Sequence, residues 1–253
     1  MSDADDDAPA GKAAPRGDRI AKYLARAGVA SRRDAEKLLI DGKVRMNNVV
    51  VTHPATFVGA GDLVTVGGKL VDTPDKTRLW RYHKPEGLVT THRDPEDRPT
   101  VFQKMPAHLP RVVSVGRLDL NSEGLLLLTN DGALARQLEL PSNGWLRRYR
   151  VRVFGAVDAP ALASLAKGVT IEGVRYGEIE AAIDSRKGDN TWLTMSLREG
   201  RNREIRRVLL HLGYRVSRLI RVAYGPFQLG MLERGAVEEV TGKVLREQLP
   251  KLA

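Results

Sequence analysis

The sequence predicts an α+β protein with two parts, a small amino-terminal module and a larger domain built on a mixed, largely antiparallel sheet. Three observations support this prediction. The chain has 253 residues, enough for more than one domain. Residues 18 to about 70 show two helical patterns followed by strand-like alternation. From residue 79 onward, short apolar stretches are separated by Gly, Pro and Asp, and long helical patterns are few.

The composition favours a polyanionic partner and excludes several kinds of site. With 41 Lys and Arg against 31 Asp and Glu, the net charge is +10, which favours nucleic acid first and an anionic membrane second. The chain has no cysteine, so a disulfide, a thiolate metal site and a cysteine nucleophile are excluded. No apolar stretch approaches the roughly 20 residues of a membrane span, and the acidic start is unlike a signal peptide. We therefore expect a cytoplasmic protein without a membrane partner.

The first elements can be read from caps and helical periodicity. Residues 1–17 are polar and acidic, which predicts a disordered tail. Ile20 and Leu24 then share one face of a predicted helix that ends at Gly28. A second helix is predicted to start after Ser31 as its N-cap and to stop at Gly42.

Residues 43–68 alternate like short strands, with Asn47 and Asn48 at a predicted hairpin turn. The exposed positions of this module are mostly basic, and the pattern alone fits RNA binding and a plain solvated surface equally well. The segment RIAKYLARAGVASRRDAEKLLIDGKVRMNN resembles the S-four-type RNA-binding module, named for a ribosomal protein. The resemblance implies that residues 18–70 bind RNA through basic side chains, namely Lys22, Arg26, Arg32 and Arg33.

A polar, proline-containing linker is predicted over residues 71–78, followed by a second domain over residues 79–250. Its strands are predicted at 79–83, 111–115, 125–129, 148–154, 170–173, 191–197 and 218–224. Its helices are predicted at 132–139, 159–167, 202–212 and 243–249.

The stretch GRLDLNSEG connects two of these strands and carries Arg117 and Asp119. Loops held by rigid strands are common places for catalytic residues. In extended backbone the two side chains project to the same side, and a cation beside a carboxylate keeps it ionised. The spacing alone also fits an ordinary turn aspartate. Asp131, in a nearby Asn-Asp-Gly sequence, has a structural explanation as a helix cap.

Two basic clusters follow this loop. WLRRYRVRVF, residues 145–154, interleaves arginines with aromatic residues, which fits base stacking with phosphate contacts and equally an edge strand with outward charges. Residues 198–221 hold eight arginines, several of them on a predicted helix, and no comparable acidic segment exists to neutralise them. A solvated basic helix is the simpler alternative.

Taken in order, these clusters resemble one family. GRLDLNSEGLLLLTNDG, RRYRVRV, EGRNREIRRV and SRLIRVAYG, preceded by YHKPEGLVTTHRDPEDRPTVF, are similar to the ribosomal RNA pseudouridine synthases of the small-subunit synthase A class. Members of that class carry the same amino-terminal module. The segments DPEDRPTVF, EGRNREIRR and VSRLIRVAYG are most similar to the large-subunit synthase B subfamily. The resemblance implies a pseudouridine synthase catalytic domain over residues 79–250.

The resemblance also implies the reaction, isomerisation of a uridine in large-subunit (23S) ribosomal RNA to pseudouridine, with no cofactor and no metal. Asp119 would be the essential carboxylate, attacking the anomeric carbon or taking the 2′ proton. Tyr149 would stack on the flipped uracil, and Arg117 would hold the extruded nucleotide. Arg206 would pair with Asp119, with Arg203 as the competing choice. Further substrate contacts are implied for Leu219 as an apolar wall and for Arg148, Arg207 and Arg221.

Alternatives stay open at this point. The same reaction could act on small-subunit (16S) RNA or on another 23S hairpin, because motifs do not report how two domains grip RNA. A ribosome assembly factor that binds RNA without chemistry would have the same composition, although it would not need to keep the Arg-Leu-Asp of residues 117–119. The five histidines have no metal-ligand spacing, and we expect the protein to act as a monomer.

Overall fold

The computed structural model describes residues 17–249, so the tail predicted for residues 1–17 lies outside the described residues except for Gly17. The chain forms two compact units, one running through Lys76 and the other starting at Thr77. Each unit has its own buried apolar core. Within residues 17–249, no helix has the length and apolar character needed to cross a membrane.

The amino-terminal unit packs two short helices, α1 (Ile20–Arg26) and α2 (Arg32–Ile40), against short strands. Ile20, Leu24 and Leu39 are fully buried between them. Four strands pair antiparallel in the order β3-β2-β5-β6. The strands of the unit are β1 (Asp18–Arg19), β2 (Val44–Met46), β3 (Val49–Val50), β4 (Phe57–Val58), β5 (Val64–Val66) and β6 (Lys69–Leu70), with β1 pairing β4.

Two local predictions for this unit are confirmed. The Ser31 hydroxyl accepts a hydrogen bond of 3.1 Å from the backbone N–H of Asp34, as an N-cap does. Asn47 and Asn48 have φ angles of 49° and 67° in the turn between β2 and β3. A type I′ hairpin turn requires positive φ at both central residues, and asparagine tolerates it better than most residues.

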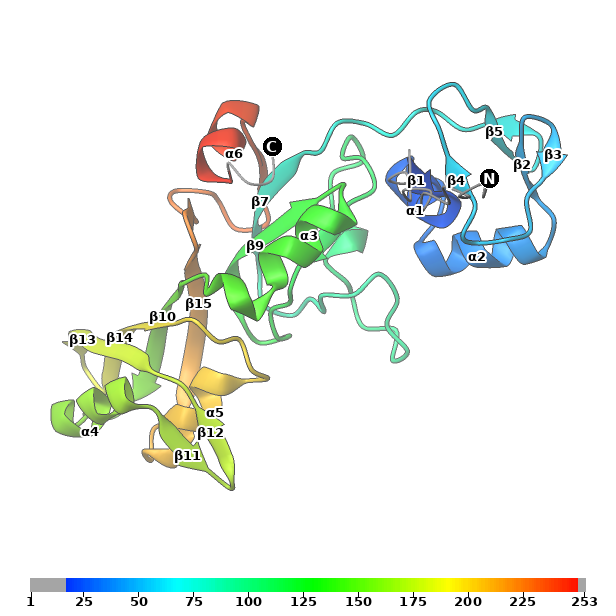
Figure 1. Cartoon of the computed structure of the whole chain (residues 1–253). Helices are drawn as coiled ribbons and strands as arrows, with labels where there is room; N and C mark the ends of the chain where they lie inside the picture. The colour runs from blue at the N-terminus through cyan, green and yellow to red at the C-terminus, as the bar shows by residue number, and fades with distance from the viewer. Residues whose placement is uncertain (1–16, 250–253) are drawn as a thin grey trace, which may run out of the picture. The chain divides into compact units, whose positions relative to one another are not determined.

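The second unit is built on a mixed sheet whose strands run in the order β13-β14-β10-β15-β9-β7-β17 (Figure 1). Among the described neighbours, β9 and β15 pair parallel and all the others antiparallel, which confirms the predicted sheet type. These strands are β7 (Leu79–Lys84), β9 (Glu123–Thr129), β10 (Arg147–Phe154), β13 (Ile179–Lys187), β14 (Asn190–Leu197), β15 (Val216–Tyr224) and β17 (Val237–Val240).

Shorter elements complete this unit. Two short strands extend the main sheet, β8 (Val113–Val115) on β9 and β16 (Phe227–Gln228) on β15. The predicted strand at 170–173 is instead a separate hairpin of β11 (Val169–Ile171) and β12 (Val174–Tyr176), because the chain turns at Glu172 and Gly173, both with positive φ. The helices are α3 (Gly132–Glu139), α4 (Ala159–Ala163), α5 (Glu204–His211) and α6 (Gly242–Gln248), with 3-10 turns at Phe102–Lys104, Pro141–Asn143 and Ser164–Lys167.

Strand β9 is buried on both faces, which explains its four consecutive leucines. Leu126 and Leu128 point into a core shared with β10, β14 and α5. Leu125 and Leu127 point into a second core that includes Leu138 of α3. The residues that follow the connection of 116–122 are therefore fixed by packing on two sides.

Both edge strands of the main sheet, β13 and β17, were not predicted. In β13 the buried or partly buried residues alternate with exposed ones and are Ile179, Ala181 and Ile183. The exposed positions include Glu180 and Asp184. β17 reads Val-Glu-Glu-Val and pairs with β7. An edge strand needs apolar residues on one face only and often carries charges, so neither segment shows the apolar run by which the inner strands were found.

The parallel contact between β9 and β15 depends on Gly124. Its φ is +105°, and a Cβ there would lie 2.3 Å from the carbonyl oxygen of Arg221 and 2.7 Å from its backbone nitrogen. Because no L side chain fits that approach, glycine is required where the two strands meet.

We expect Gly124→Ala to lower the free energy of unfolding by about 3 kcal/mol, because the methyl group collides with backbone that cannot move without breaking the β9–β15 pairing. Gly188→Ala, in the turn between β13 and β14, is the matched control. Its φ is +56° with nothing within 4 Å of a Cβ, so it should cost only about 1 kcal/mol. Chemical unfolding followed by circular dichroism measures both, and equal losses would contradict the steric argument.

Candidate active site

The loop of residues 116–122, between β8 and β9, carries Asp119 and is fixed through its own carbonyl groups. The backbone carbonyl oxygens of residues 118, 119, 120, 121 and 122 all accept hydrogen bonds. The donors are the Thr90 hydroxyl to 118 (2.9 Å), Lys84 Nζ to 119 (3.1 Å) and 122 (2.8 Å), the backbone N–H of Gly87 to 120 (2.8 Å), and Arg206 Nη2 to 121 (2.7 Å). The direction of the Asp119 side chain is therefore set by its backbone.

Lys84 contributes most to this arrangement. The side chain is completely buried, and Nζ donates to the carbonyl oxygens of Pro85, Asp119 and Ser122 at 3.0, 3.1 and 2.8 Å. An ammonium has three N–H donors, so its capacity matches these three acceptors. Burial lowers the pKa of Lys84 to about 8, so at neutral pH the amine is still largely protonated and can donate all three bonds.

Asp119 forms its ion pair with Arg203, whose Nη1 lies 3.6 Å from Oδ2. The carboxylate side chain is 30% exposed and so can be reached from solvent. Arg203 is the residue before α5 and has a left-handed backbone, with φ 52°. This conformation turns the chain into the helix just where the guanidinium meets Asp119.

The pairing predicted between Arg206 and Asp119 is wrong in this structure, and the competing choice, Arg203, makes it. Arg206 is the third residue of α5 and is half-buried, and burial lowers the pKa of its guanidinium. It donates to the carbonyl oxygens of Asn121 (2.7 Å) and Val216 (3.3 Å). Arg206 thus links the Asp119 loop to β15 through the backbone.

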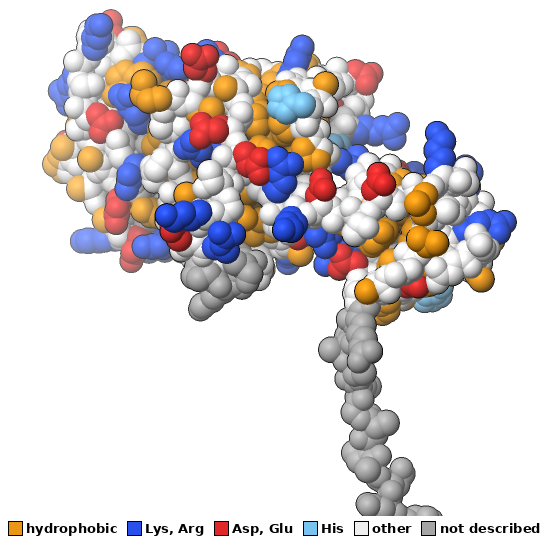
Figure 2. All heavy atoms as spheres, turned by 90° about the horizontal axis from the view of Figure 1, so that it is seen from above, with side chains coloured by type: hydrophobic (Ala, Val, Ile, Leu, Met, Phe, Trp, Pro, Cys, Tyr) orange, Lys and Arg blue, Asp and Glu red, His pale blue; other side chains and the backbone are white. Residues whose placement is uncertain are grey.

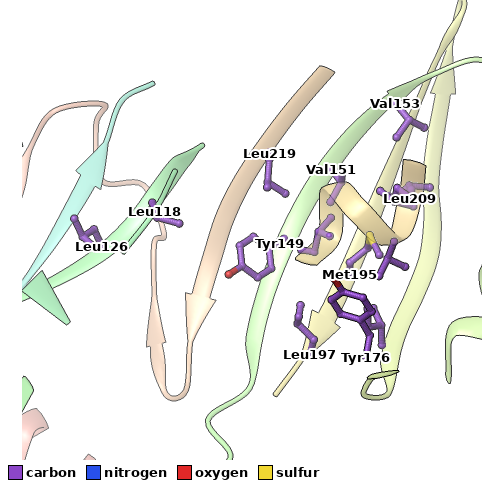
Figure 3. Close-up of a cluster of buried hydrophobic side chains, with 14 of the residues drawn as sticks. Leu118, Leu126, Tyr149, Val151, Val153, Tyr176, Met195, Leu197, Leu209 and Leu219 are labelled. Carbon is purple, nitrogen blue, oxygen red and sulfur yellow. The ribbon is translucent and has the colours of Figure 1, made fainter. Parts of the chain in front are cut away.

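Tyr149 and Leu219 form an apolar wall of the site. Tyr149 is 9% exposed and Leu219 is 6% exposed, and they project from the adjacent strands β10 and β15 at the edge of the larger core (Figure 3). Both line a cavity of about 840 Å³ that also contains Asp119. A volume of this size suits a small molecule or a single extruded nucleotide.

The cavity is strongly basic. Seven arginines and four acidic residues line it, a balance that favours a polyanion. On the face drawn in Figure 2, by contrast, Lys and Arg side chains are spread out with acidic and apolar side chains between them. The arginines of the cavity include Arg117, Arg203 and Arg221, all three of them sites predicted from the sequence.

Glu204, the first residue of α5, is a buried acid in the cavity wall that the sequence analysis missed. It is 4% exposed, and Oε2 accepts a hydrogen bond of 2.9 Å from the backbone N–H of Arg201. Burial, with a smaller contribution from the nearby Glu199 carboxylate, raises the pKa of Glu204 to about 7. Its position could have been read from helix periodicity, since it lies four residues before the buried Val208.

Not all predicted residues come together at this cavity. Arg148 is exposed on the other face of β10, and Arg147, which has the same parity as Tyr149, lines the cavity instead. Arg207 is exposed on α5 and is not part of the lining. The remaining four residues belong to the amino-terminal unit, where Lys22 and Arg26 pair with Asp18 and where Arg32 and Arg33 are exposed on α2.

Two nearby acids have structural roles. The Asp131 carboxylate accepts a hydrogen bond of 2.8 Å from the backbone N–H of Ala133 and caps α3, as predicted. Glu123, placed by the sequence in the loop, is instead the first residue of β9, where it is 2% exposed and pairs with Arg218 and Arg234 at 2.5 and 2.6 Å. Of these three acids, Asp119 is the one that lines the cavity.

Two protein-family models match this chain. The model of the RNA pseudouridylate synthase family matches residues 78–211, and the model of the S4 domain matches residues 18–64. An uncharacterised RNA pseudouridine synthase of Rickettsia bellii is 50% identical over 228 residues, which cover 90% of this chain and 99% of the relative. The ribosomal large subunit pseudouridine synthase B of Pasteurella multocida is 42% identical over 231 residues, covering 88% of this chain and 67% of the relative.

A solved structure supports the same conclusion at the level of the fold. A crystal structure of a pseudouridylate synthase has a TM-score of 0.64 and 25% sequence identity to this chain, covering 91% of this chain and 99% of that one. The family predicted from the Arg-Leu-Asp loop and the basic clusters is therefore confirmed. The chain belongs to the RNA pseudouridine synthases and carries an S4 domain at its amino-terminal end.

Proposed function

We propose that this enzyme isomerises a uridine of large-subunit ribosomal RNA, with Asp119 as the reacting carboxylate. Relatives from Pasteurella multocida and Salmonella typhi, 42% and 40% identical to this chain, are named ribosomal large subunit pseudouridine synthase B. The observation that carries the Asp119 assignment is a carboxylate on a loop with five bonded carbonyls, open to a basic cavity.

In the proposed reaction, the bond between uracil N1 and sugar C1′ breaks, the uracil turns, and C5 bonds to C1′. C5 then loses a proton and N1 gains one, so substrate and product contain the same atoms. Asp119 attacks C1′ or removes the 2′ proton. Either role needs an ionised carboxylate, and the Arg203 guanidinium 3.6 Å away favours that form.

The cavity walls fit an extruded base. Flipping a nucleotide out of a stack costs a few kcal/mol, and stacking on an aromatic ring returns about 1–3 kcal/mol per base. Tyr149 provides that ring and Leu219 the apolar surface beside it. Arg117, exposed on the loop two residues before Asp119, is placed to hold the flipped nucleotide.

Glu204 is a positioning residue in this proposal. It bonds the backbone of Arg201 at the start of the turn that presents Arg203. Burial raises its pKa to about 7, so the neutral form is much easier to populate than for an exposed glutamate. Its hydrogen bond to the Arg201 backbone holds this turn in place.

A first prediction concerns the substrate and Asp119. Deleting the gene should remove a pseudouridine from large-subunit ribosomal RNA, and the wild-type gene should restore it. Asp119→Asn should slow the reaction by about 10⁴-fold or more and fail to restore the mark. The measurement is a pseudouridine map of both ribosomal subunits.

Asp131→Asn is the matched control for that map, because asparagine also caps a helix, and it should restore the mark fully. Restoration by Asp119→Asn would rule out the proposed role of this carboxylate. A mark lost from small-subunit RNA instead would show that the substrate assignment is wrong.

A second prediction concerns the S4 domain. Arg32 and Arg33 are exposed at the start of α2 and form no ion pair among the described residues. Changing both to Gln should weaken RNA binding and reduce the slope of log K against log salt by about 1–2, since each lost phosphate contact removes one released counterion. Changing both to Lys keeps the charges and should keep the slope. A slope unchanged in the Gln variant would mean that α2 does not contact the RNA.

A third prediction follows from Glu204. Its pKa in the folded protein lies above the value of 4.5 expected in the unfolded chain, so protonation of Glu204 stabilises the fold and that stability is lost as pH rises through about 7. Between pH 8 and pH 5, wild type should gain about 2 kcal/mol of unfolding free energy relative to Glu204→Gln. Urea unfolding of both proteins at the two pH values tests this, and a pH-independent difference would exclude a raised pKa.

A further inference from the structure

Four arginines of the cavity form no ion pair in the described part of the chain: Arg93, Arg117, Arg147 and Arg221. Arg93 and Arg117 are exposed, whereas Arg147 on β10 is half-buried and Arg221 on β15 is buried. The other three arginines of the cavity lining are paired with acids: Arg98 with Asp94, Arg201 with Glu199 and Arg203 with Asp119. Arg221 is only 3% exposed. A buried cation without an acid is costly unless another anion is present when the protein acts.

Both guanidinium groups are held against one aromatic ring. Arg147 lies 4.8 Å and Arg221 5.2 Å from the ring centroid of Tyr224. The Tyr224 hydroxyl accepts from Arg147 Nη2 at 3.1 Å and donates to the carbonyl oxygen of Leu138 at 2.9 Å. Tyr224 itself is 2% exposed. The two cations are therefore fixed in place before any ligand arrives, which lowers the entropic cost of binding one.

The protein leaves many of their donors unused. A guanidinium has five N–H groups. Arg147 uses Nη1 for the carbonyl oxygens of Trp145 and Arg198 and Nη2 for Tyr224. Arg221 uses only Nε, for the carbonyl oxygen of Leu125 at 2.8 Å, and its Nη2 is buried without a hydrogen-bond partner. Within residues 17–249, these two guanidinium groups therefore have backbone carbonyls and one hydroxyl as acceptors, but no carboxylate in an ion pair.

We propose that Arg147 and Arg221 form a phosphate subsite, which takes a backbone phosphate next to the target uridine. Two guanidinium groups with free N–H donors match the oxygens of a phosphate, and an RNA substrate brings one such anion with each nucleotide. This inference rests on the proposed function, because it takes the RNA to enter the cavity that holds Asp119.

The register of the sheet places this subsite beside the flipped base. Arg147 lies two residues before Tyr149 on β10, so both project from the same face about 7 Å apart. Arg221 is the direct partner of Tyr149 on β15. The ring proposed to stack on uracil and the two unpaired cations are thus neighbours, so the phosphate that they bind is one that flanks the target.

The test uses a hairpin RNA spanning the uridine located by the pseudouridine map, with Asp119→Asn protein so that binding is read without turnover. Two modified hairpins each replace one phosphate flanking the target, on its 5′ or 3′ side, by a neutral methylphosphonate. One modification should weaken binding about tenfold. Arg147→Gln should weaken binding of the unmodified hairpin by a similar factor. On the hairpin whose methylphosphonate weakens binding, the same variant should show little or no further loss of affinity.

Arg221→Gln should behave in the same way. Because Arg221 is buried, thermal melting first checks that the Arg221→Gln variant folds. If that variant does not fold, the test relies on Arg147→Gln alone, since Arg147 is only half-buried. Arg136→Gln removes an exposed arginine of α3 outside the cavity and should keep the wild-type ratio between modified and unmodified hairpins. If neither methylphosphonate weakens binding, or if its effect multiplies with that of Arg147→Gln, the subsite is refuted. The pseudouridine map does not depend on these outcomes, so the two proposals can fail separately.

Discussion

The chemistry proposed for the cavity depends on how the backbone of residues 118–122 is held. Five consecutive carbonyl oxygens accept hydrogen bonds from three parts of the unit: the end of β7, the segment after it, and α5. A buried carbonyl without a donor costs free energy comparable to a lost hydrogen bond, so this loop has little freedom to rearrange. Lys84 and Arg206 use their charged donors on backbone, and Asp119 is left with one ion pair, to Arg203. The carboxylate is therefore aimed by the scaffold and remains available to a substrate.

The arginines around the cavity fall into groups with different surroundings. Arg203 meets the Asp119 carboxylate, and Arg206 braces the loop through Asn121 and Val216. Arg147 and Arg221 lie against the Tyr224 ring and form no ion pair with any residue of the described range. One type of side chain thus has three kinds of surroundings here. Arg203 faces a carboxylate, Arg206 donates to backbone carbonyls, and Arg147 and Arg221 keep some N–H donors that no group of the described protein accepts.

Much of this could be predicted from sequence because it is encoded locally. The loop between two apolar strands, the Ser31 cap and the family motifs are each contained in a short segment. What could not be predicted depends on three-dimensional register. The choice between Arg203 and Arg206 turns on a left-handed residue at the start of α5, which no apolar pattern reports. The burial of Lys84 could have been predicted, since it has the same parity as the buried Tyr82 on β7. A lysine that follows alternating buried aromatic residues is, however, easily taken for the exposed end of the strand.

The parallel contact of β9 with β15 has a consequence for how this enzyme is made. It joins Glu123 and Gly124 to Ile220 and Arg221, and the walls of the site at Leu219 and Tyr224 come from that same late segment. A ribosome releasing the chain from its amino-terminal end therefore delivers Asp119 about a hundred residues before the strand that completes its surroundings. The loop must wait for that non-local pairing, which is intrinsically slow to form. Because the S4 domain has its own core and lies at the amino-terminal end, it has its whole sequence outside the ribosome first.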